Sequence, residues 1–288
     1  MENPDSISAQ KDLRSLIASC NLPLAQDLPI TLLRGGNTNS TYLLGNRFIA
    51  KIGDALWNET RFLSMAATHG IHVPKLIASN KIDGKYIIIM EYLHNTLSGR
   101  DAILSKQEWH QVGIEAGRQL RRIHALDMQI TPTESIASLR SFLTLPKTQY
   151  ISQEIYQEAL EAVLIYGCNQ LSFVHGDFTP HNLLIHKETH ELIAIIDPSG
   201  RIQEAPPYFD YVRAKISRWS TSDFFEGLHT GYNNAKLDWK ILTLFEWVLS
   251  GHYAEIYAMM GDEISSQRLQ KRFAILTKQM HNLKDINS

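Results

Sequence analysis

The sequence predicts an α+β fold with two lobes, a small strand-rich lobe followed by a larger, mostly helical lobe. Up to about residue 93, short apolar runs alternate with turn residues, a pattern typical of strands. Beyond residue 94, apolar residues recur mainly at the spacing of helices. We therefore divide the 288 residues into an amino-terminal lobe, residues 1–93, and a carboxy-terminal lobe, residues 94–288. A chain of this length is long enough for two moderate domains with their own cores.

The small lobe is expected to contain a sheet that begins with a hairpin. Residues 30–44 hold two apolar runs around Gly35 and Gly36, which predicts a strand, a glycine turn and a second strand. Residues 47–52 predict the next strand, and residues 86–93 predict a strand that leads out of the lobe.

In the small lobe, a leading helix is expected at about residues 6–19 and a second helix after Asp54, and helices are expected throughout the larger lobe. An apolar face at roughly helical spacing follows Asp54 (Leu56, Phe62, Leu63 and Ala66). In the larger lobe, residues 105–126 place apolar side chains on one stripe, and residues 152–166 predict another helix. His124, near the end of the first of these two helices, is interpreted as a packed or hydrogen-bonded structural histidine.

Short strands also interrupt the larger lobe. Residues 171–174, 183–185 and 192–196 are apolar runs rich in Ile and Leu, and residues 187–190 between the last two predict a hairpin turn. Polar side chains at the ends of these strands would be held rigidly and aimed at one point.

Three polar residues near these strands have the spacing of a kinase active site. Asp177 precedes Asn182 by five residues, and Asp197 follows Asn182 by fifteen, at the end of an apolar run. Phosphoryl transfer requires mainly positioned groups and countercharge, and Mg²⁺ prefers carboxylate and amide oxygens as ligands. The alternative interpretation is a simple turn, because Gly176 and Asp177 favour turns anyway. The joint spacing favours the catalytic interpretation.

The segment His175-Gly176-Asp177, together with Asn182 and Asp197, resembles the aminoglycoside phosphotransferase superfamily, which includes choline kinase-like and fructosamine kinase-like enzymes. The resemblance implies a protein kinase-like fold with an antiparallel sheet in the small lobe. It also implies that Asp177 orients the acceptor hydroxyl, while Asn182 and Asp197 hold magnesium.

The same resemblance implies a nucleotide site in the small lobe. Gly35, Gly36 and Asn37 would form a phosphate-binding loop, Lys51 would pair with the phosphates, and Glu59 would orient Lys51. Each residue also has a plain structural interpretation. The glycines suit an ordinary hairpin turn, Lys51 suits a surface strand, and Glu59 suits a solvated first turn of a helix, where the helix dipole favours an acid.

The end of the small lobe would bind the adenine edge. By resemblance, backbone groups around Glu91 and Leu93 form this hinge, with Met90 at the back of the pocket. The implied nucleotide is ATP, with GTP as an alternative, and the implied metal is Mg²⁺.

Beyond Asp197 the chain departs from the protein-kinase pattern. Pro198 replaces the Phe of D-F-G, and no A-P-E motif follows. Glu204 and Asp210 match by position the Glu and the Tyr-Asp or Phe-Asp that follow in fructosamine kinase-like proteins. We interpret Asp210 as stabilising the catalytic loop or a helix start, with a direct substrate role as the minor alternative.

The rest of the chain would form a helical cap over the acceptor. From Pro206 onward it is rich in aromatic residues, most of which we assign to the core. Nine acidic and ten basic residues balance there, which lends no support to a polycationic acceptor such as an aminoglycoside.

Composition excludes several other classes of protein. The net charge of −2 argues against a nucleic-acid-binding surface, and no apolar run is long enough to span a bilayer. The amino terminus lacks the apolar core of a secretory signal, so we expect a cytoplasmic protein with no membrane contact and no obligate protein partner.

The sequence therefore predicts an enzyme that transfers the γ-phosphoryl group of ATP, with magnesium, to a hydroxyl of a small molecule. Sugars, amino sugars, aminoglycosides and amino alcohols are the acceptors considered. The alternative functions are a catalytically silent nucleotide-binding regulatory module and a protein kinase, against which the absent A-P-E motif argues.

Overall fold

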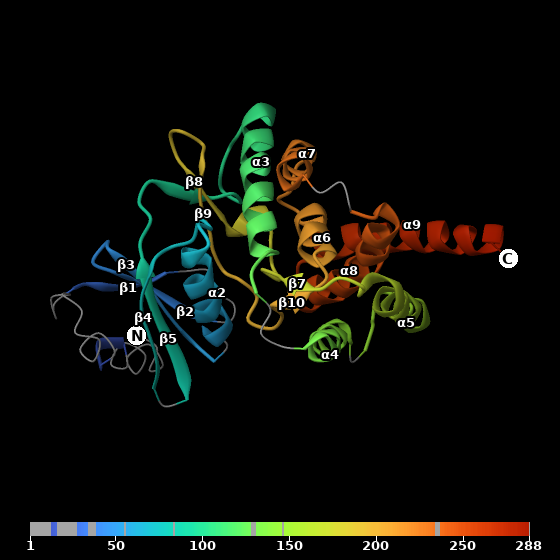
Figure 1. The fold of residues 1–288 in the computed structure, drawn as a ribbon, viewed down its shortest axis with the longest axis horizontal. Coiled ribbons are helices and arrows are strands. Elements are labelled where there is room, and N and C mark those ends of the chain that lie inside the picture. The colour runs from blue at the N-terminus through green and yellow to red at the C-terminus, as the bar shows by residue number, and fades with distance from the viewer. Residues whose placement is uncertain are drawn as a thin grey trace.

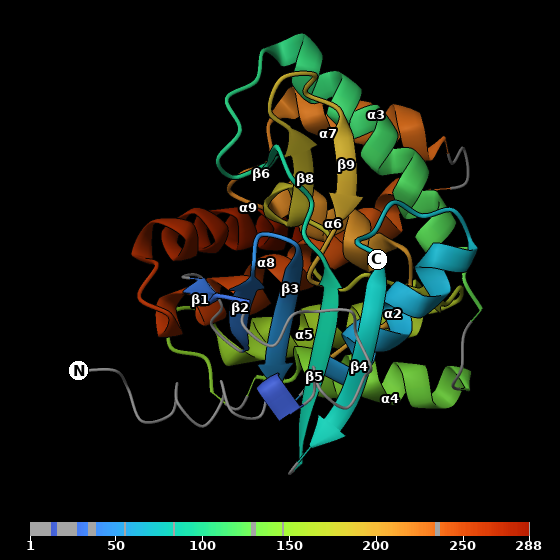
Figure 2. The same ribbon diagram turned by 90° about the vertical axis from the view of Figure 1, so that its left-hand side faces the viewer.

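A computed structural model describes residues 13–15, 28–33, 39–54, 56–82, 84–127, 131–145, 147–233 and 237–287. The small lobe is built mainly on a sheet, and the large lobe is built of helices with short sheets (Figures 1 and 2). The predicted α+β, two-lobed fold class is confirmed.

The small lobe is built on a five-stranded antiparallel sheet of spatial order β1-β2-β3-β5-β4. Its strands are β1 (Ile30–Leu33), β2 (Ser40–Leu44), β3 (Phe48–Gly53), β4 (Leu76–Ile82) and β5 (Lys85–Glu91). Successive side chains of a strand face opposite sides. Ala50 and Ile52 therefore join one apolar cluster with Ile87 and Ile89, while Lys51 faces the other side of the sheet.

Helix α2 (Leu56–Thr68) connects the two lobes. It buries the apolar face expected from the sequence, and Glu59 is buried on the same face. Phe62 of this helix stacks on Phe173 of the large lobe, with ring centroids 6.1 Å apart. Because its buried residues join the core cluster of the large lobe, α2 positions Glu59 between the sheet and the large lobe.

Two short sheets in the large lobe hold the segments that carry the predicted site residues. One comprises β6 (Thr96–Ser98), β8 (Leu183–His186) and β9 (Leu192–Ile195); the other comprises β7 (Ser172–Phe173) and β10 (Glu204–Ala205). The strands expected at residues 171–174, 183–185 and 192–196 are confirmed within one or two residues. The hairpin turn between β8 and β9 is also present, with His190 at a φ of 58°.

Helices form the rest of the large lobe. They are α3 (Lys106–Ile123), α4 (Pro132–Leu143), α5 (Gln153–Ala162), α6 (Tyr208–Ile216), α7 (Ser222–Tyr232), α8 (Trp239–Met259) and α9 (Glu263–Asn287). A turn of π-helix, Val163–Gly167, continues α5 and so accounts for the helix expected to reach residue 166. His124 bonds the Tyr232 hydroxyl at 2.7 Å, which confirms its structural interpretation.

Helices α3 and α7 lie side by side at unusually close range (Figure 1). Gly113 and Gly117 of α3 face Gly227 and Gly231 of α7, and a Cβ added to any of them would meet backbone of the other helix within 2.3 Å. The spacing of four residues places each pair of glycines on one helix face. The four glycines therefore permit the close crossing that braces the large lobe.

The two lobes are also joined by polar contacts. The Asn58 amide donates to the Gly200 carbonyl at 2.7 Å, and the Gln203 amide donates to the Asn58 carbonyl at 2.5 Å. The Arg61 guanidinium binds the carboxylate of Glu204 at 2.8 Å. These contacts connect α2 with the segment that follows Asp197. No helix among the described residues is long and apolar enough to cross a membrane.

Candidate active site

The candidate catalytic strip has two parts: the loop between β7 and β8, which ends in one turn of 3-10 helix, Pro180–Asn182, and the residues that follow β9 up to Asp197. Within it, the Asn182 amide Nδ2 donates to the Asp177 carbonyl at 2.9 Å and to the Asp177 carboxylate Oδ2 at 3.0 Å. The predicted pair is thus brought together by local hydrogen bonds across the loop. The side chain of Asp177 is 39% exposed, so a ligand can reach it.

Asp197 meets this pair at the end of the segment after β9. The Ile196 N–H donates to the Asn182 carbonyl at 3.0 Å, which ties the two segments together. Asp197 adopts a φ of 57°, a conformation that Asp tolerates better than most residues because its short side chain can bond locally. Its carboxylate contacts the Lys51 ammonium, and its side chain remains 47% exposed. The three polar residues of the strip therefore converge with Lys51.

Lys51 also pairs with Glu59, as expected from the sequence. The Lys51 Nζ lies 2.7 Å from Glu59 Oε1, and both side chains are buried. Burial would lower the pKa of Lys51, but the carboxylates of Glu59 and Asp197 outweigh it and raise that pKa above its ordinary value. Burial raises the pKa of Glu59, which Lys51 only partly offsets. Burial opposes charge on Asp197 as well, yet the ammonium of Lys51 lowers the pKa of this carboxyl.

Asp210 stabilises the loop of Asp177 by accepting backbone hydrogen bonds. This fully buried carboxylate accepts from the backbone N–H of His175 at 2.7 Å and from that of Gly176 at 2.8 Å, and its Oδ2 lies 3.2 Å from His124 Nε2. Gly176 has a φ of 78°, and a Cβ there would lie 2.5 Å from the Ile202 carbonyl oxygen, so glycine is required. Of the two roles weighed for Asp210, loop stabilisation agrees with these contacts.

His175 sits behind the loop as a neutral orienting group. It is fully buried, and its Nε2 lies 3.0 Å from the Ile196 carbonyl, while its Nδ1 accepts from the Asp177 N–H at 3.3 Å. Burial lowers the pKa of His175, although Asp210 and Asp177 act in the opposite direction. The ring therefore links the loop of Asp177 with the segment of Asp197.

Arg213 is a residue of the candidate site that the sequence reasoning missed. Its guanidinium binds Oδ1 of Asp177 and lies over the ring of Tyr253, with its carbon 3.7 Å from the ring centroid. Burial opposes the charge, but Tyr253 and Asp177 raise the pKa of Arg213 above its ordinary value. One signal was present in the sequence, because residues three apart share a helix face and Arg213 follows Asp210 by three.

A stacked aromatic pair flanks the catalytic loop. The rings of His181 and Trp219 have centroids 4.8 Å apart and an interplanar angle of 25°. Ser98 fixes the loop here by donating to the His181 carbonyl at 2.6 Å. Burial and the nearby Arg100 lower the pKa of His181. Trp219 is only partly buried, so part of its ring stays accessible beside His181.

The structure describes only part of the expected nucleotide-binding segment. Gly35, Gly36 and Asn37 lie outside the described residues. At the expected hinge, the Glu91 N–H donates to the Lys75 carbonyl at 3.0 Å, and the Glu91 carboxylate accepts from the Lys75 N–H at 2.7 Å. Within the described residues the Leu93 N–H donates to no other group.

The oxygen atoms of Asn182 and Asp197 suit Mg²⁺ better than a metal that needs several protein ligands. Within the described part of the chain, no three His, Cys, Asp and Glu side chains are placed to hold a metal ion. The Asp197 carboxylate is accessible, and the described side-chain hydrogen bonds of Asn182 all come from Nδ2, which leaves Oδ1 for a cation. One carboxylate and one amide oxygen, completed by water and phosphate, are typical of Mg²⁺ sites.

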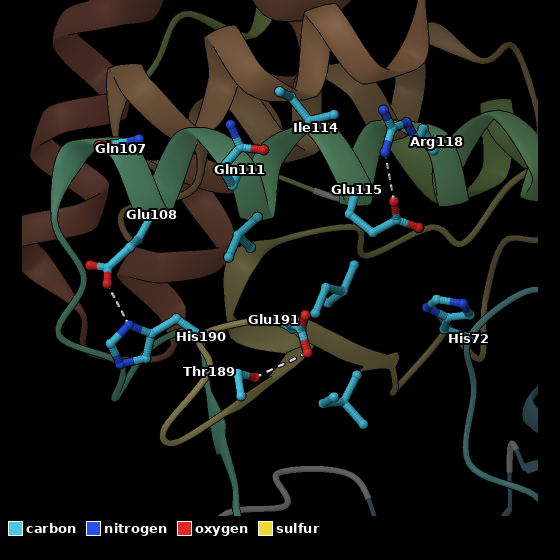
Figure 3. Close-up of a pocket in the computed structure, with 13 residues that line it drawn as sticks. His72, Gln107, Glu108, Gln111, Ile114, Glu115, Arg118, Thr189, His190 and Glu191 are labelled. Atoms are coloured by element: carbon cyan, nitrogen blue, oxygen red, sulfur yellow. Dashed lines mark hydrogen bonds and ion pairs between the residues drawn. The ribbon is translucent and has the colours of Figure 1, made fainter.

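A groove of about 770 Å³ lies away from this site, between α3 and the β8–β9 hairpin (Figure 3). There, Glu108 binds His190 at 2.6 Å and also caps α3 through the Ser105 N–H at 2.7 Å. The hydrogen bonds from Ser105 and His190 lower the pKa of Glu108 to about 2. None of the groove residues belongs to the catalytic strip, and the Glu108–His190 pair attaches the hairpin to the helix.

Comparison with known proteins agrees with this geometry. The chain is similar to a solved aminoglycoside 2'-phosphotransferase-IIIa in its GDP complex, with a TM-score of 0.66, 14% identity, and coverage of 93% of this chain and 98% of that one. It is similar to the choline kinase of Streptococcus pneumoniae (TM-score 0.62, 16% identity, 93% and 98% coverage). It is also similar to a spectinomycin phosphotransferase in complex with ADP and spectinomycin (TM-score 0.59, 15% identity, 93% and 96% coverage).

At these identities the solved structures establish the fold alone. No curated protein sequence matches the chain. A family model does match, over residues 29–245, which include the whole catalytic strip and Lys51. On that evidence the chain belongs to the phosphotransferase enzyme family.

Proposed function

We propose that this protein is a small-molecule kinase, which transfers the γ-phosphoryl group of a magnesium-bound nucleoside triphosphate to an acceptor hydroxyl. The observation that carries the proposal is the convergence of Asp177, Asn182, Asp197 and Lys51 from both lobes onto one partly exposed site. Membership of a phosphotransferase family supports the same chemistry.

The nucleotide phosphates would lie against Lys51. Its ammonium is held by Glu59 and touches Asp197, so it presents a fixed positive charge where phosphate oxygens need countercharge. Asn182 and Asp197 would hold Mg²⁺, which when bound neutralises charge on the phosphate oxygens. The adenine edge would meet the backbone at Glu91 and Leu93. We favour ATP, although similar structures hold GDP as well as ADP.

Asp177 would act on the acceptor. The acceptor oxygen forms a bond to the γ-phosphorus, the bond from that phosphorus to the β–γ bridging oxygen breaks, and the nucleoside diphosphate leaves. Asp177 accepts a hydrogen bond from the attacking hydroxyl and takes up its proton as the new bond forms. Arg213 and Asn182 each donate to a different oxygen of this carboxylate, which fixes its plane.

The two alternative functions predict different results in phosphorylation assays. A silent nucleotide-binding module would bind Mg-ATP with no turnover in any acceptor panel. A protein kinase would phosphorylate generic protein substrates; the short connection from Asp197 to α6 and the absence of an A-P-E motif favour a small acceptor instead.

The proposal is tested by replacing Asp177 with Ala. Turnover with Mg-ATP is measured across sugars, amino sugars, amino alcohols, hydroxy acids and aminoglycosides, and nucleotide affinity is measured by calorimetry. We expect turnover to fall by at least about a hundredfold, because general-base catalysis supplies that much, while nucleotide affinity stays within about twofold. Glu161→Gln, an exposed acid on α5, is the control. Unchanged turnover in Asp177→Ala would exclude the proposed role.

A further inference from the structure

Arg213 and Lys51 reach the candidate site from different lobes. Lys51 reaches the site from the sheet of the small lobe, whereas Arg213 reaches it from α6 of the large lobe. The acceptor must contact Asp177, and the phosphate-binding side is already defined by Lys51 and Asp197. Arg213 therefore contacts Asp177 from the large lobe, the lobe that would also bind the acceptor under the proposed function.

The guanidinium of Arg213 is buried with unused donors. Its side chain is only 6% exposed, and one nitrogen, Nη2, binds Asp177. The other two nitrogens, Nε and Nη1, have no hydrogen-bond partner within the described residues. Buried charged donors without partners cost stability, so native structures retain them mainly where something else binds.

The chemistry of these donors specifies the kind of partner. A guanidinium has no acceptor atom and stays charged, so only groups with oxygen lone pairs satisfy it, and carboxylates and phosphates do so most strongly. Stacking on Tyr253 fixes its plane and so the direction of its N–H groups.

Three buried acids of α6 and α8 already have partners within the protein. Asp210 is occupied by the catalytic loop, and Glu246 pairs with Lys215 and Arg272 at 2.7 Å each. Glu255 accepts three backbone N–H groups of residues 149–151. Because these buried carboxylates already have partners, they are not available to bind a polycationic acceptor.

We propose that the acceptor carries an anionic group, a carboxylate or a phosphate, which Arg213 binds while Asp177 faces the hydroxyl. This inference rests on the proposed kinase function and narrows it to hydroxy acids or phosphorylated alcohols. Arg213 would thus be the residue that selects the acceptor, and polycationic aminoglycosides would be poor acceptors.

Four three-carbon probes that differ in charge test the inference. Glycerate carries a carboxylate, glycerol 3-phosphate a phosphate, glycerol no charge, and 3-amino-1,2-propanediol a cation. Each is titrated calorimetrically into the full-length protein saturated with Mg-ADP, so that the nucleotide site is not available to the anions. The variants are Arg213→Met, Arg213→Lys and, as a matched control, Arg140→Met, which removes an arginine from an exposed pair with Glu161 on another face.

We expect at least one anionic probe to bind about tenfold more tightly than the neutral and cationic probes, in the millimolar range. Arg213→Met should abolish that preference, Arg213→Lys should retain part of it because the charge remains, and Arg140→Met should leave it unchanged. Comparing glycerate with glycerol 3-phosphate shows whether the site prefers a carboxylate or a phosphate. Equal or undetectable binding of all four probes, or a preference that survives in Arg213→Met, would overturn the inference.

The outcome can be separated from failure of the proposed function. Binding of Mg-ADP to the wild type and to Arg213→Met, measured first, reports whether the nucleotide site exists and whether the variant is folded. If nucleotide binds and an amine-bearing acceptor alone is phosphorylated, the kinase function stands and the anionic acceptor is wrong. If no nucleotide binds, the proposed function itself fails.

Discussion

Lys51 and Glu59 form a buried ion pair at 2.7 Å although only eight residues separate them. The short connection succeeds because β3 ends at Gly53 and α2 starts at Leu56, so that Glu59 lies in the first turn of the helix and faces the sheet. One lysine thereby joins a helix of the small lobe to Asp197 of the large lobe.

Glu59→Gln should weaken nucleotide use. The amide cannot balance the buried ammonium of Lys51, whose position then depends on Asp197 alone, so we expect kcat/KM for ATP to fall about tenfold to a hundredfold. Steady-state kinetics with varied ATP checks this. Glu161→Gln, in the exposed pair with Arg140, is the matched control. A Glu59→Gln enzyme with wild-type kinetics would show that the pair has no role in nucleotide binding.

Asp210→Asn should destabilise the catalytic loop. The amide has one acceptor oxygen and would point its NH₂ at a backbone N–H of His175 or Gly176, so we expect a loss of about 3 kcal/mol in unfolding free energy together with lower turnover. Denaturant unfolding measures the first effect. Glu161→Gln should cost less than about 1 kcal/mol because its pair with Arg140 is exposed. Equal stabilities of the two variants would contradict this assignment.

Gly231→Ala should destabilise the protein, even though alanine favours helices by about 1 kcal/mol over glycine. The new Cβ would lie 1.8 Å from the Ile114 carbonyl oxygen, and this backbone atom cannot move without separating α3 from α7. We expect a net loss of about 1–3 kcal/mol, measured by thermal or denaturant unfolding. Thr230→Ala, at the adjacent exposed position, should change stability by less than about 0.5 kcal/mol. A stabilised Gly231→Ala protein would disprove the close crossing.

His252 should make the fold sensitive to mild acid. Burial, with a contribution from Arg213, lowers its pKa to about 3, although a hydrogen bond with the Leu143 backbone opposes this. Between pH 6.5 and about 3, the unfolded state binds a proton at this position that the folded state does not. Stability contributed by neutral His252 is therefore full above pH 6.5 and falls as the pH drops through that window.

The measurement compares the wild type with His252→Phe, which keeps a ring against Phe142 and Tyr253. Denaturant unfolding at pH 7, 6 and 5 gives the difference in unfolding free energy, and other titrating groups cancel in that difference. Below pH 6.5, the wild type should lose up to about 1.4 kcal/mol of unfolding free energy per pH unit relative to His252→Phe. Parallel pH profiles would show that His252 is not held neutral by the fold.

Much of the site could be predicted because its parts are local in the chain. Asp177 and Asn182 are joined by hydrogen bonds across one loop. The apolar run before Asp197 forms the strand β9, as its local sequence predicts. One predictable element was missed. Helix α4 begins with a complete capping box, in which Thr131 and Glu134 bond each other's backbone N–H, and the sequence signal Thr-Pro-x-Glu was present.

Sequence alone determined the kind of chemistry, since residue type and spacing along the chain specify which groups can serve phosphoryl transfer. It also determined the alternation of strands and helices, because the periods of two and 3.6 residues are properties of the local backbone. Only the tertiary structure decided which long-range partners meet. Arg213 reaches Asp177 across 36 residues and stacks on Tyr253 of another helix, a convergence that depends on the packing of α6 against α8. Packing is a property of the whole core, so no local pattern could reveal which donors remain unpaired beside Asp177.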